Sequence, residues 1–263
     1  MARFCPLFSS SSGNCTYIGG ASGGVLIDVG VSAKRTAEAL RSIGVELDSI
    51  GAVFVTHEHG DHVKGLRVFA GSHGIDVYTS QGTFDALETM SILTGKYSAK
   101  VIPKNGVEAC DMFVSAFPTS HDSRESVGYV VTMPDGRRIA VATDTGIVTD
   151  DAVQALLGCD LVMLESNHDV RMLQNGPYPY HTKRRVLSSV GHLSNDACAI
   201  TATTLLQNGT TRFVLGHLSR QNNIPQLAYQ TTYAAFCETG AQEKTDYILT
   251  VAGSVDTPQV TVF

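Results

Sequence analysis

Three histidines and one aspartate are concentrated in a short segment near residue 60. His57, His59, Asp61 and His62 stand within six consecutive positions. Imidazole and carboxylate groups are the ordinary protein ligands of zinc, manganese and iron. Single histidines are common in protein cores and on surfaces, but four such donors in six positions are not. The segment therefore predicts a metal site.

The residues before this segment predict that it lies at the end of a strand. Residues 51–55 (GAVFV) form an apolar run typical of a buried strand, and a glycine and an aspartate soon after it indicate a turn. Alternate side chains of extended backbone share one face, so His57 and His59 project together. Glu58 alternates with them, and we expect it to be a solvated or hydrogen-bonding neighbour. The remaining two donors follow the turn, so one loop can supply two adjacent metal positions.

The spacing His-x-His-x-Asp-His resembles the loop signature of the metallo-β-lactamase superfamily, and the resemblance covers nearly the whole chain. An apolar segment that ends at Asp28 matches an earlier motif, in which the aspartate holds the loop that carries the metal ligands. Here that loop, called the metal loop below, is residues 56–62. His121, Asp144 and His217 match three later motifs, and the last two follow apolar segments. Five motifs thus occur in the order of the superfamily.

The resemblance implies a centre of two divalent metal ions. It assigns one ion to His57, His59 and His121, a second to Asp61, His62 and His217, and places Asp144 between them. Two such ions about 3.5–4 Å apart activate a shared water, so the expected nucleophile is a bridging hydroxide that attacks a phosphodiester or an acyl bond, with Asp61 essential for catalysis. Zinc and manganese both suit this donor set, because no thiolate is among the seven ligands.

Composition and pattern predict a single layered domain over residues 1–263. The chain is 43% hydrophobic and 17% charged, without a low-complexity tract. We expect strands at 15–18, 25–27, 51–55, 76–78, 128–133, 137–142, 161–164 and 212–215, and helices at 33–43, 63–70, 83–89, 183–189, 195–207 and 225–237. The expected fold is α+β, a four-layer αββα sandwich of the metallo-β-lactamase type. The segment 145–216 is too short for a large inserted cap domain, so we expect an open active site.

The cysteines and the amino terminus indicate a cytoplasmic protein. Residues 1–6 lack the apolar core of about 7–15 residues that a secretory signal needs, and no run approaches the ~18 apolar residues of a membrane span. The six cysteines include no CxxC pair, so reduced thiols are expected rather than disulfides. These features argue against a membrane partner and against a secreted, antibiotic-hydrolysing lactamase.

Residues near 168 and 192 indicate a phosphate-binding region. His192 stands shortly before a predicted helix that Ser194 can cap. Free N–H groups and the positive dipole end of a helix favour an anion, and a histidine there can protonate a leaving oxygen. We therefore expect His192 to be catalytic and Ser194, Asn195 and His168 to contact substrate. The alternative is that His192 is an ordinary residue of the capping region.

The Ser- and Gly-rich segment 9–14 is predicted to be a loop with two possible roles. It connects strands, or its small side chains and N–H groups approach a phosphate, with Ser12 and Asn14 as the contacts. Together with the segments around residues 168, 192 and 217, it resembles the bacterial YycJ/WalJ (VicX) branch of the superfamily. That resemblance implies a nuclease, namely an exonuclease that degrades DNA from the 5′ end.

The net charge of −6 is unusual for a nucleic-acid-binding protein. Two bound divalent ions add +4 and leave −2, and they neutralise carboxylates where substrate binds. Basic residues at 34–35, 137–138 and 183–185 are candidate backbone contacts, although such residues are more often simply solvated. We expect binding to nucleic acid ends, with DNA favoured over RNA.

Two other functions are compatible with the same donors. One is a glyoxalase II-like or lactonase-like hydrolase of a small thioester or ester, which needs no phosphate site at a helix end. The other is a non-catalytic regulatory relative that keeps the fold. Retention of all seven predicted ligands argues against the second.

Overall fold

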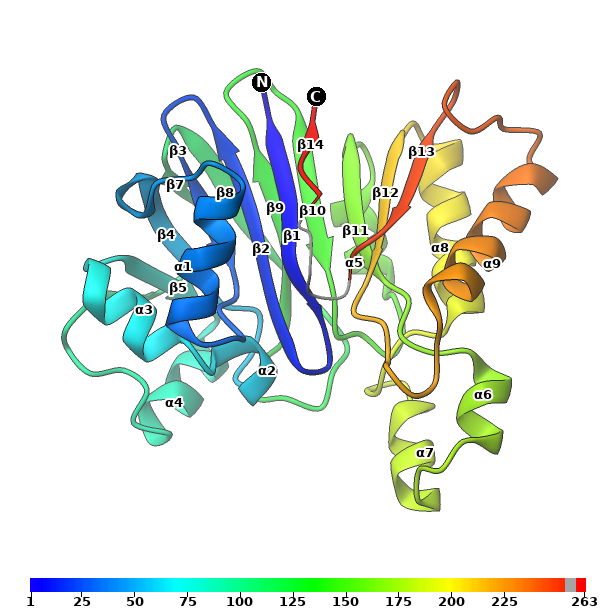
Figure 1. Ribbon diagram of the computed structural model, residues 1–263, viewed down its shortest axis with the longest axis horizontal. Coiled ribbons are helices and arrows are strands. Elements are labelled where there is room, and N and C mark those ends of the chain that lie inside the picture. The colour runs from blue at the N-terminus through cyan, green and yellow to red at the C-terminus, as the bar shows by residue number, and fades with distance from the viewer. Residues whose placement is uncertain (254–258) are drawn as a thin grey trace. The chain divides into compact units, whose positions relative to one another are not determined.

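The computed structural model describes residues 1–253 and 259–263 and divides the chain into two compact units (Figure 1). The first unit contains residues 1–116, 123–137 and the described part of 253–263, and the second contains residues 117–122 and 138–252. The single domain expected from the sequence stays a prediction.

The first unit contains a mixed seven-stranded sheet with the order β14-β1-β2-β3-β4-β5-β6. Its strands are β1 (Arg3–Ser10), β2 (Gly13–Gly20), β3 (Gly23–Ile27), β4 (Ile50–Phe54), β5 (Asp76–Thr79), β6 (Ala99–Val101) and β14 (Thr261–Val262). Strands β14, β1, β2 and β3 pair antiparallel, whereas β3, β4, β5 and β6 pair parallel. Parallel neighbours need crossover connections, and helices provide them.

The helices of the first unit are α1 (Ala33–Ser42), α2 (Gly60–Val63), α3 (Leu66–His73) and α4 (Gln81–Thr89), with a 3-10 turn η1 (Leu47–Ser49). Ser32 and Ser80 cap α1 and α4 by accepting hydrogen bonds from backbone N–H groups of the first turn. Gly74 ends α3 with a φ of 62°, a conformation that glycine adopts without strain. The helices contribute residues such as Leu40, Leu66 and Phe69 to the core against the sheet.

A second seven-stranded sheet draws strands from both units. Strands β7 (Val107–Ala109), β8 (Met112–Pro118) and β9 (Val127–Thr132) begin it, and β10 (Arg138–Ala142), β11 (Leu161–Glu165), β12 (Arg212–Gly216) and β13 (Ile248–Val251) follow in the second unit. Within the first unit the two sheets face each other, because the Tyr129 ring of β9 meets the Phe54 ring of β4 edge to face at 5.4 Å. The Tyr129 hydroxyl also donates to the Val55 carbonyl.

The second unit is built on the parallel strands β10 to β13. Its helices are α5 (Asp150–Leu156), α6 (Val170–Asn175), α7 (Tyr180–Val186), α8 (Asn195–Gln207) and α9 (Pro225–Glu238), and α8 and α9 pack beside each other (Figure 1). Strand β11 is buried along its whole length, as expected for a parallel sheet. Because the strands are parallel, the residues that follow β10, β11 and β12 meet at one edge of the sheet.

The predicted α+β fold with two mixed sheets is confirmed. Residues 145–216, all of them described, lie within the second unit and form no inserted domain. Within the described residues, no helix combines the length and apolarity that crossing a membrane requires.

Two predictions about elements were wrong. The helix expected at 63–70 is two helices, α2 and α3. The segment 9–14 is mostly strand, since Ser9 pairs with Asn14 across a hairpin whose turn is only Ser11 and Ser12. The run of four serines followed by Gly13 and Asn14 contains no apolar residue, and it hid the strand ends.

Candidate metal centre and catalytic site

The first donor cluster lies in the first unit and extends from the loop after β4 into α2. His57 and His62 are fully buried, and His59 and Asp61 are partly exposed. The ring centroid of His57 lies 4.5 Å from that of His59 and 4.1 Å from that of His62. Imidazoles from both sides of the turn are therefore gathered, as the sequence predicted.

Asp28 holds this cluster from the end of the neighbouring strand β3. Its Oδ1 accepts from the Thr56 N–H at 2.8 Å, and its Oδ2 accepts from the Thr56 hydroxyl at 2.8 Å and from His62 Nδ1 at 2.7 Å. The backbone of Asp28 has a φ of 63°, a strained conformation for a residue other than glycine. The expectation that Asp28 braces the metal loop is confirmed.

The hydrogen bonds around Thr56 also fix the protonation of His57. The single hydroxyl hydrogen of Thr56 goes to Asp28, so Thr56 Oγ1 must accept from His57 Nδ1, which lies 3.0 Å away. His57 and His62 therefore both carry hydrogen on Nδ1 and a lone pair on Nε2. A metal-binding histidine in proteins has this arrangement, with an oxygen holding its other nitrogen.

The end of the β1–β2 hairpin packs on the same loop. The Asn14 amide nitrogen lies 3.0 Å from His62 Nε2 and 3.4 Å from both the backbone oxygen and Oδ2 of Asp61. Gly30 allows this approach, because a Cβ at that position would overlap the Asp61 carbonyl. Asn14 thus positions predicted ligands, and its contact with substrate stays a prediction. Ser12 is exposed at the hairpin tip.

Glu58 is partly exposed and forms a hydrogen bond outside the donor cluster. Its Oε1 accepts from the Arg124 N–H at 2.9 Å. The prediction of a hydrogen-bonding neighbour is confirmed.

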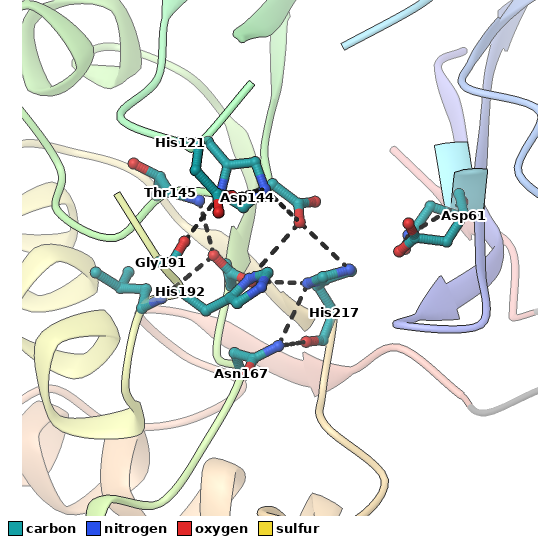
Figure 2. A network of polar contacts seen from close by, with 12 residues as sticks. Asp61, His121, Asp144, Thr145, Asn167, Gly191, His192 and His217 are labelled. Atoms are coloured by element: carbon teal, nitrogen blue, oxygen red, sulfur yellow. Dashed lines mark hydrogen bonds and ion pairs between the residues drawn. The ribbon is translucent and has the colours of Figure 1, made fainter. Parts of the chain in front are cut away.

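The second donor cluster lies in the second unit, at the carboxyl ends of its parallel strands. Figure 2 shows His121, Asp144, His192 and His217 around a shared set of polar contacts. Asp144 and His217 have φ values of 56° and 55°, so both positions after strands β10 and β12 are strained. One ligand atom from each of Asp144, Glu165, His192 and His217 lies within 4.8 Å of the others, a spacing compatible with one metal ion.

Glu165, which the sequence analysis did not select, is the centre of this cluster. Its Oε1 accepts from His192 Nδ1 at 2.8 Å and from His217 Nδ1 at 2.7 Å. Its Oε2 accepts from the Thr145 and Leu193 N–H groups at 2.8 and 3.3 Å. A carboxylate closing an apolar strand was the available signal, and Asp28 closes an apolar strand in the same way.

The electrostatics of the second cluster follow from this carboxylate. Burial alone raises the pKa of Glu165, but His192 and His217 outweigh burial and lower it to about 2. Burial lowers the pKa of His192, but Glu165 outweighs that effect and the net change is upward. Burial lowers the pKa of His121, whose Nδ1 donates to the Gly191 carbonyl at 3.0 Å.

Both clusters fit divalent metal ions. His57, His62, His121 and His217 each have Nδ1 held by an oxygen, which leaves the lone pair on Nε2. Neutral imidazoles in this tautomer, together with carboxylates, are what a divalent cation needs.

The three predicted substrate contacts of the second unit have different surroundings. Ser194 caps α8 by accepting from the Ala197 N–H at 3.2 Å, which confirms the predicted cap. The buried Asn195 side chain accepts from the Ser166 hydroxyl at 2.7 Å and exchanges hydrogen bonds with Asn223. His168 is buried, and neither of its ring nitrogens has a hydrogen-bond partner among the described residues. Substrate contact by these residues stays a prediction.

Comparison with known proteins identifies relatives along most of the chain. The model of the β-lactamase superfamily domain matches residues 24–218. Exodeoxyribonuclease YycJ of Bacillus anthracis is 35% identical over 243 residues, which cover 90% of this chain and 90% of that protein. Exodeoxyribonuclease WalJ of Streptococcus pneumoniae is 36% identical over 233 residues, 87% of this chain and 86% of that protein.

A solved structure shares the fold at low sequence identity. Zn²⁺-bound PqqB from Methylobacterium extorquens superposes with a TM-score of 0.74 and 16% identity, covering 99% of this chain and 100% of that one. This likeness concerns the fold alone.

Proposed function

Because this chain belongs to the metallo-β-lactamase superfamily and to its YycJ/WalJ branch, we propose that it is a metal-dependent 5′-to-3′ DNA exonuclease. It is a hydrolase of this superfamily, and its relatives named exodeoxyribonucleases match it over about nine-tenths of its length. One observation carries the proposal: His192 donates a hydrogen bond to Glu165 and lies beside Asp144 and His217.

We propose that the two donor clusters serve one pair of divalent ions, zinc or manganese. The proposed ligands are His57, His59, Asp61, His62, His121, Asp144 and His217. When bound, the ions supply a hydroxide nucleophile at neutral pH and stabilise charge on the attacking and leaving oxygens. The hydrogen-bonded Nδ1 atoms of the histidines described above support this assignment.

His192 is proposed to protonate the departing ester oxygen. Its Nδ1 donates to Glu165 at 2.8 Å, so Nε2 is the atom that carries a transferable proton. The buried carboxylate favours the protonated imidazole. Proton transfer to a leaving oxygen by a positioned histidine typically contributes about 10²–10⁴-fold to the rate.

Glu165 positions both histidines in this mechanism. One carboxylate oxygen orients His192 toward proton transfer and His217 toward a metal. The other oxygen is fixed by two backbone N–H groups, which prevents the carboxylate from rotating. Ligand orientation and acid orientation therefore depend on the same buried group.

A substrate panel tests the proposal. The zinc- or manganese-loaded protein is incubated with end-labelled single- and double-stranded DNA and RNA, a glutathione thioester and a lactone. We expect DNA cleavage that a chelator abolishes and added metal restores. Asp144→Asn should lose this activity, whereas Asp160→Asn, at the opposite end of the second unit's sheet, should keep it. Efficient thioester cleavage without DNA cleavage would contradict the proposal.

A further inference from the structure

A groove of about 410 Å³ lies in the first unit, and the predicted ligand Asp61 lines it at one point. Its other polar lining comes from Ser12 at the hairpin tip, Lys64 and Arg67, and its apolar side from Val63, Met90 and Ile92. These residues come from the β1–β2 turn, the α2–α3 region and the segment after α4 (Figure 1). The groove therefore begins at the metal loop and is lined by three segments of the same unit.

The two cations of the groove are available to a ligand. Lys64 directly follows α2, and Arg67 is in the first turn of α3, so they are three residues apart. Both are exposed, and neither forms an ion pair or side-chain hydrogen bond with any described residue. By contrast, Lys34, Arg137 and Arg185, which the sequence analysis considered as backbone contacts, are each paired with a carboxylate.

The apolar side of the groove suits sugars and bases. Met90 is 49% exposed although it is a large hydrophobic residue, and Ile92 is partly exposed next to it. Surfaces that bind single-stranded nucleic acid combine cations along the backbone with side chains on which bases rest. A lactone offers no second anion for a second cation, and the two carboxylates of a glutathione thioester do not form a repeating chain. The groove therefore matches a repeating phosphate chain better than a small ester.

We propose that this groove binds the single DNA strand that continues from the scissile phosphate. Lys64 and Arg67 contact successive backbone phosphates, Ser12 donates from its hydroxyl to the phosphate nearest the metal loop, and Met90 and Ile92 contact sugars or bases. This inference rests on the proposed nuclease function and adds a path for the strand outside the catalytic centre. It also explains how a protein with a net charge of −6 binds DNA, because the positive charge is local.

The salt dependence of binding tests the two phosphate contacts. Each contact with single-stranded DNA contributes about 0.7 to the slope of log Kd against log salt concentration. The double variant Lys64→Ala/Arg67→Ala should therefore lose about 1.4 from that slope. The electrostatic contribution to binding vanishes at about 1 M salt, so the wild type and the variant should bind equally there. From that point, a slope change of about 1.4 makes the Kd of the variant about tenfold larger near 0.15 M salt.

The assay is fluorescence anisotropy of the metal-loaded protein with a nuclease-resistant phosphorothioate strand. The matched control is Arg41→Ala/Lys104→Ala, which removes two exposed cations of the first unit that do not line the groove. An RNA strand of the same sequence forms a second arm. Circular dichroism of each variant establishes that its fold is retained.

Steady-state cleavage provides a readout that a merely structural role would not produce. The Lys64→Ala/Arg67→Ala substitutions should raise KM more for longer strands than for a dinucleotide, because only longer strands reach both cations. An effect on kcat that is independent of strand length would contradict the proposal.

The outcomes separate this inference from the proposed function. If the wild type cleaves DNA but the variant keeps the wild-type salt slope, or the control loses as much, the groove is not the strand path. If the wild type neither binds nor cleaves DNA, the proposed function itself fails. Equal loss of RNA and DNA binding supports phosphate recognition, whereas loss of RNA binding alone overturns the assignment to DNA.

Discussion

Replacing Glu165 with glutamine should lower the free energy of unfolding of the protein. It should also weaken metal binding and DNA cleavage. The carboxylate is fully buried and accepts four hydrogen bonds, two from imidazoles and two from backbone N–H groups. Glutamine has nearly the same shape but only one acceptor oxygen. In either orientation its NH₂ group faces two donors, so at least two hydrogen bonds are lost.

The magnitude follows from the pKa of this carboxyl group. It is about 2 in the folded protein, against an ordinary value of 4.5. The folded pKa is depressed, so the ionised carboxylate stabilises the fold above pH ~4.5, and that contribution is lost as the pH falls toward 2. The pKa lies about 2.5 below its ordinary value, and each whole pKa step corresponds to about 1.4 kcal/mol. The ionised carboxylate therefore contributes roughly 3–4 kcal/mol to the free energy of unfolding near neutral pH. Loss of the oxygen that orients His217 should also weaken metal affinity by about 10–100-fold.

Guanidinium unfolding of the chelated protein measures the stability change, and metal titration measures the affinity. The control is Asp160→Asn, a partly exposed carboxylate just before β11, the strand that ends at Glu165. Asparagine keeps the oxygen that accepts from the Arg138 N–H, so the control should change the free energy of unfolding by less than about 1 kcal/mol. A Glu165→Gln protein with wild-type stability, metal affinity and DNA cleavage would refute the role assigned to this carboxylate.

Other substitutions test separate parts of the account. Asp61→Asn should keep the melting temperature but lower DNA hydrolysis by about 100-fold or more, because a predicted metal ligand is lost; unaltered rates would exclude that role. His192→Ala should retain metal, measured by elemental analysis, and lose about 10²–10⁴-fold in single-turnover cleavage, so a wild-type rate would remove it from the mechanism. Burial lowers the pKa of His168 to about 4, so the unfolded chain takes up its proton first and stability should fall as the pH drops from about 6.5 to 4. His168→Gln should flatten the stability profile in that window, and parallel profiles would contradict this. Gly30→Ala should destabilise the fold by about 1–3 kcal/mol in thermal unfolding, because a Cβ overlaps the metal loop, whereas Gly71→Ala should not.

The sequence predicted the first donor cluster well because its members are close together in the chain. His57, His59, Asp61 and His62 lie within six positions, and the strand before them is a plain apolar run. Local spacing is therefore enough to place them together. The role of Asp28 was predicted only through the resemblance to the superfamily, since its contact with His62 spans 34 residues.

Glu165 was missed for the same physical reason. Its partners His192 and His217 are 27 and 52 residues away. The parallel pairing of β11 with β12 brings His217 to it, and hydrogen bonds of the Leu193 backbone with Glu165 and Asn167 bring His192. The strand itself was predicted, but the prediction ended it one residue before the carboxylate. Long-range hydrogen bonds of this kind leave no local periodicity in the sequence.

Fold prediction succeeded where the ends of an element carry local signals. Helix α8 has the predicted bounds, because Ser194 caps its start and Gly209, with a φ of 98°, follows its end. Strand β1 was not predicted, since Pro6 interrupts its pattern and the register of its pairing with β2 shifts between Pro6 and Phe8. The groove at Lys64 and Arg67 was likewise invisible in the sequence, because its walls come from segments up to 80 residues apart.

The most direct test of the central claim is a time course with DNA labelled at one end. The metal-loaded wild type is given single strands that carry a fluorophore at either the 5′ or the 3′ terminus, and products are separated at single-nucleotide resolution. We expect the 5′ label to be released first as a short product, while the 3′-labelled strand shortens progressively, and we expect a chelator to stop both. Release of the 3′ label first would contradict the proposed polarity. Intact DNA in both reactions with every metal tested would contradict the assignment as a nuclease.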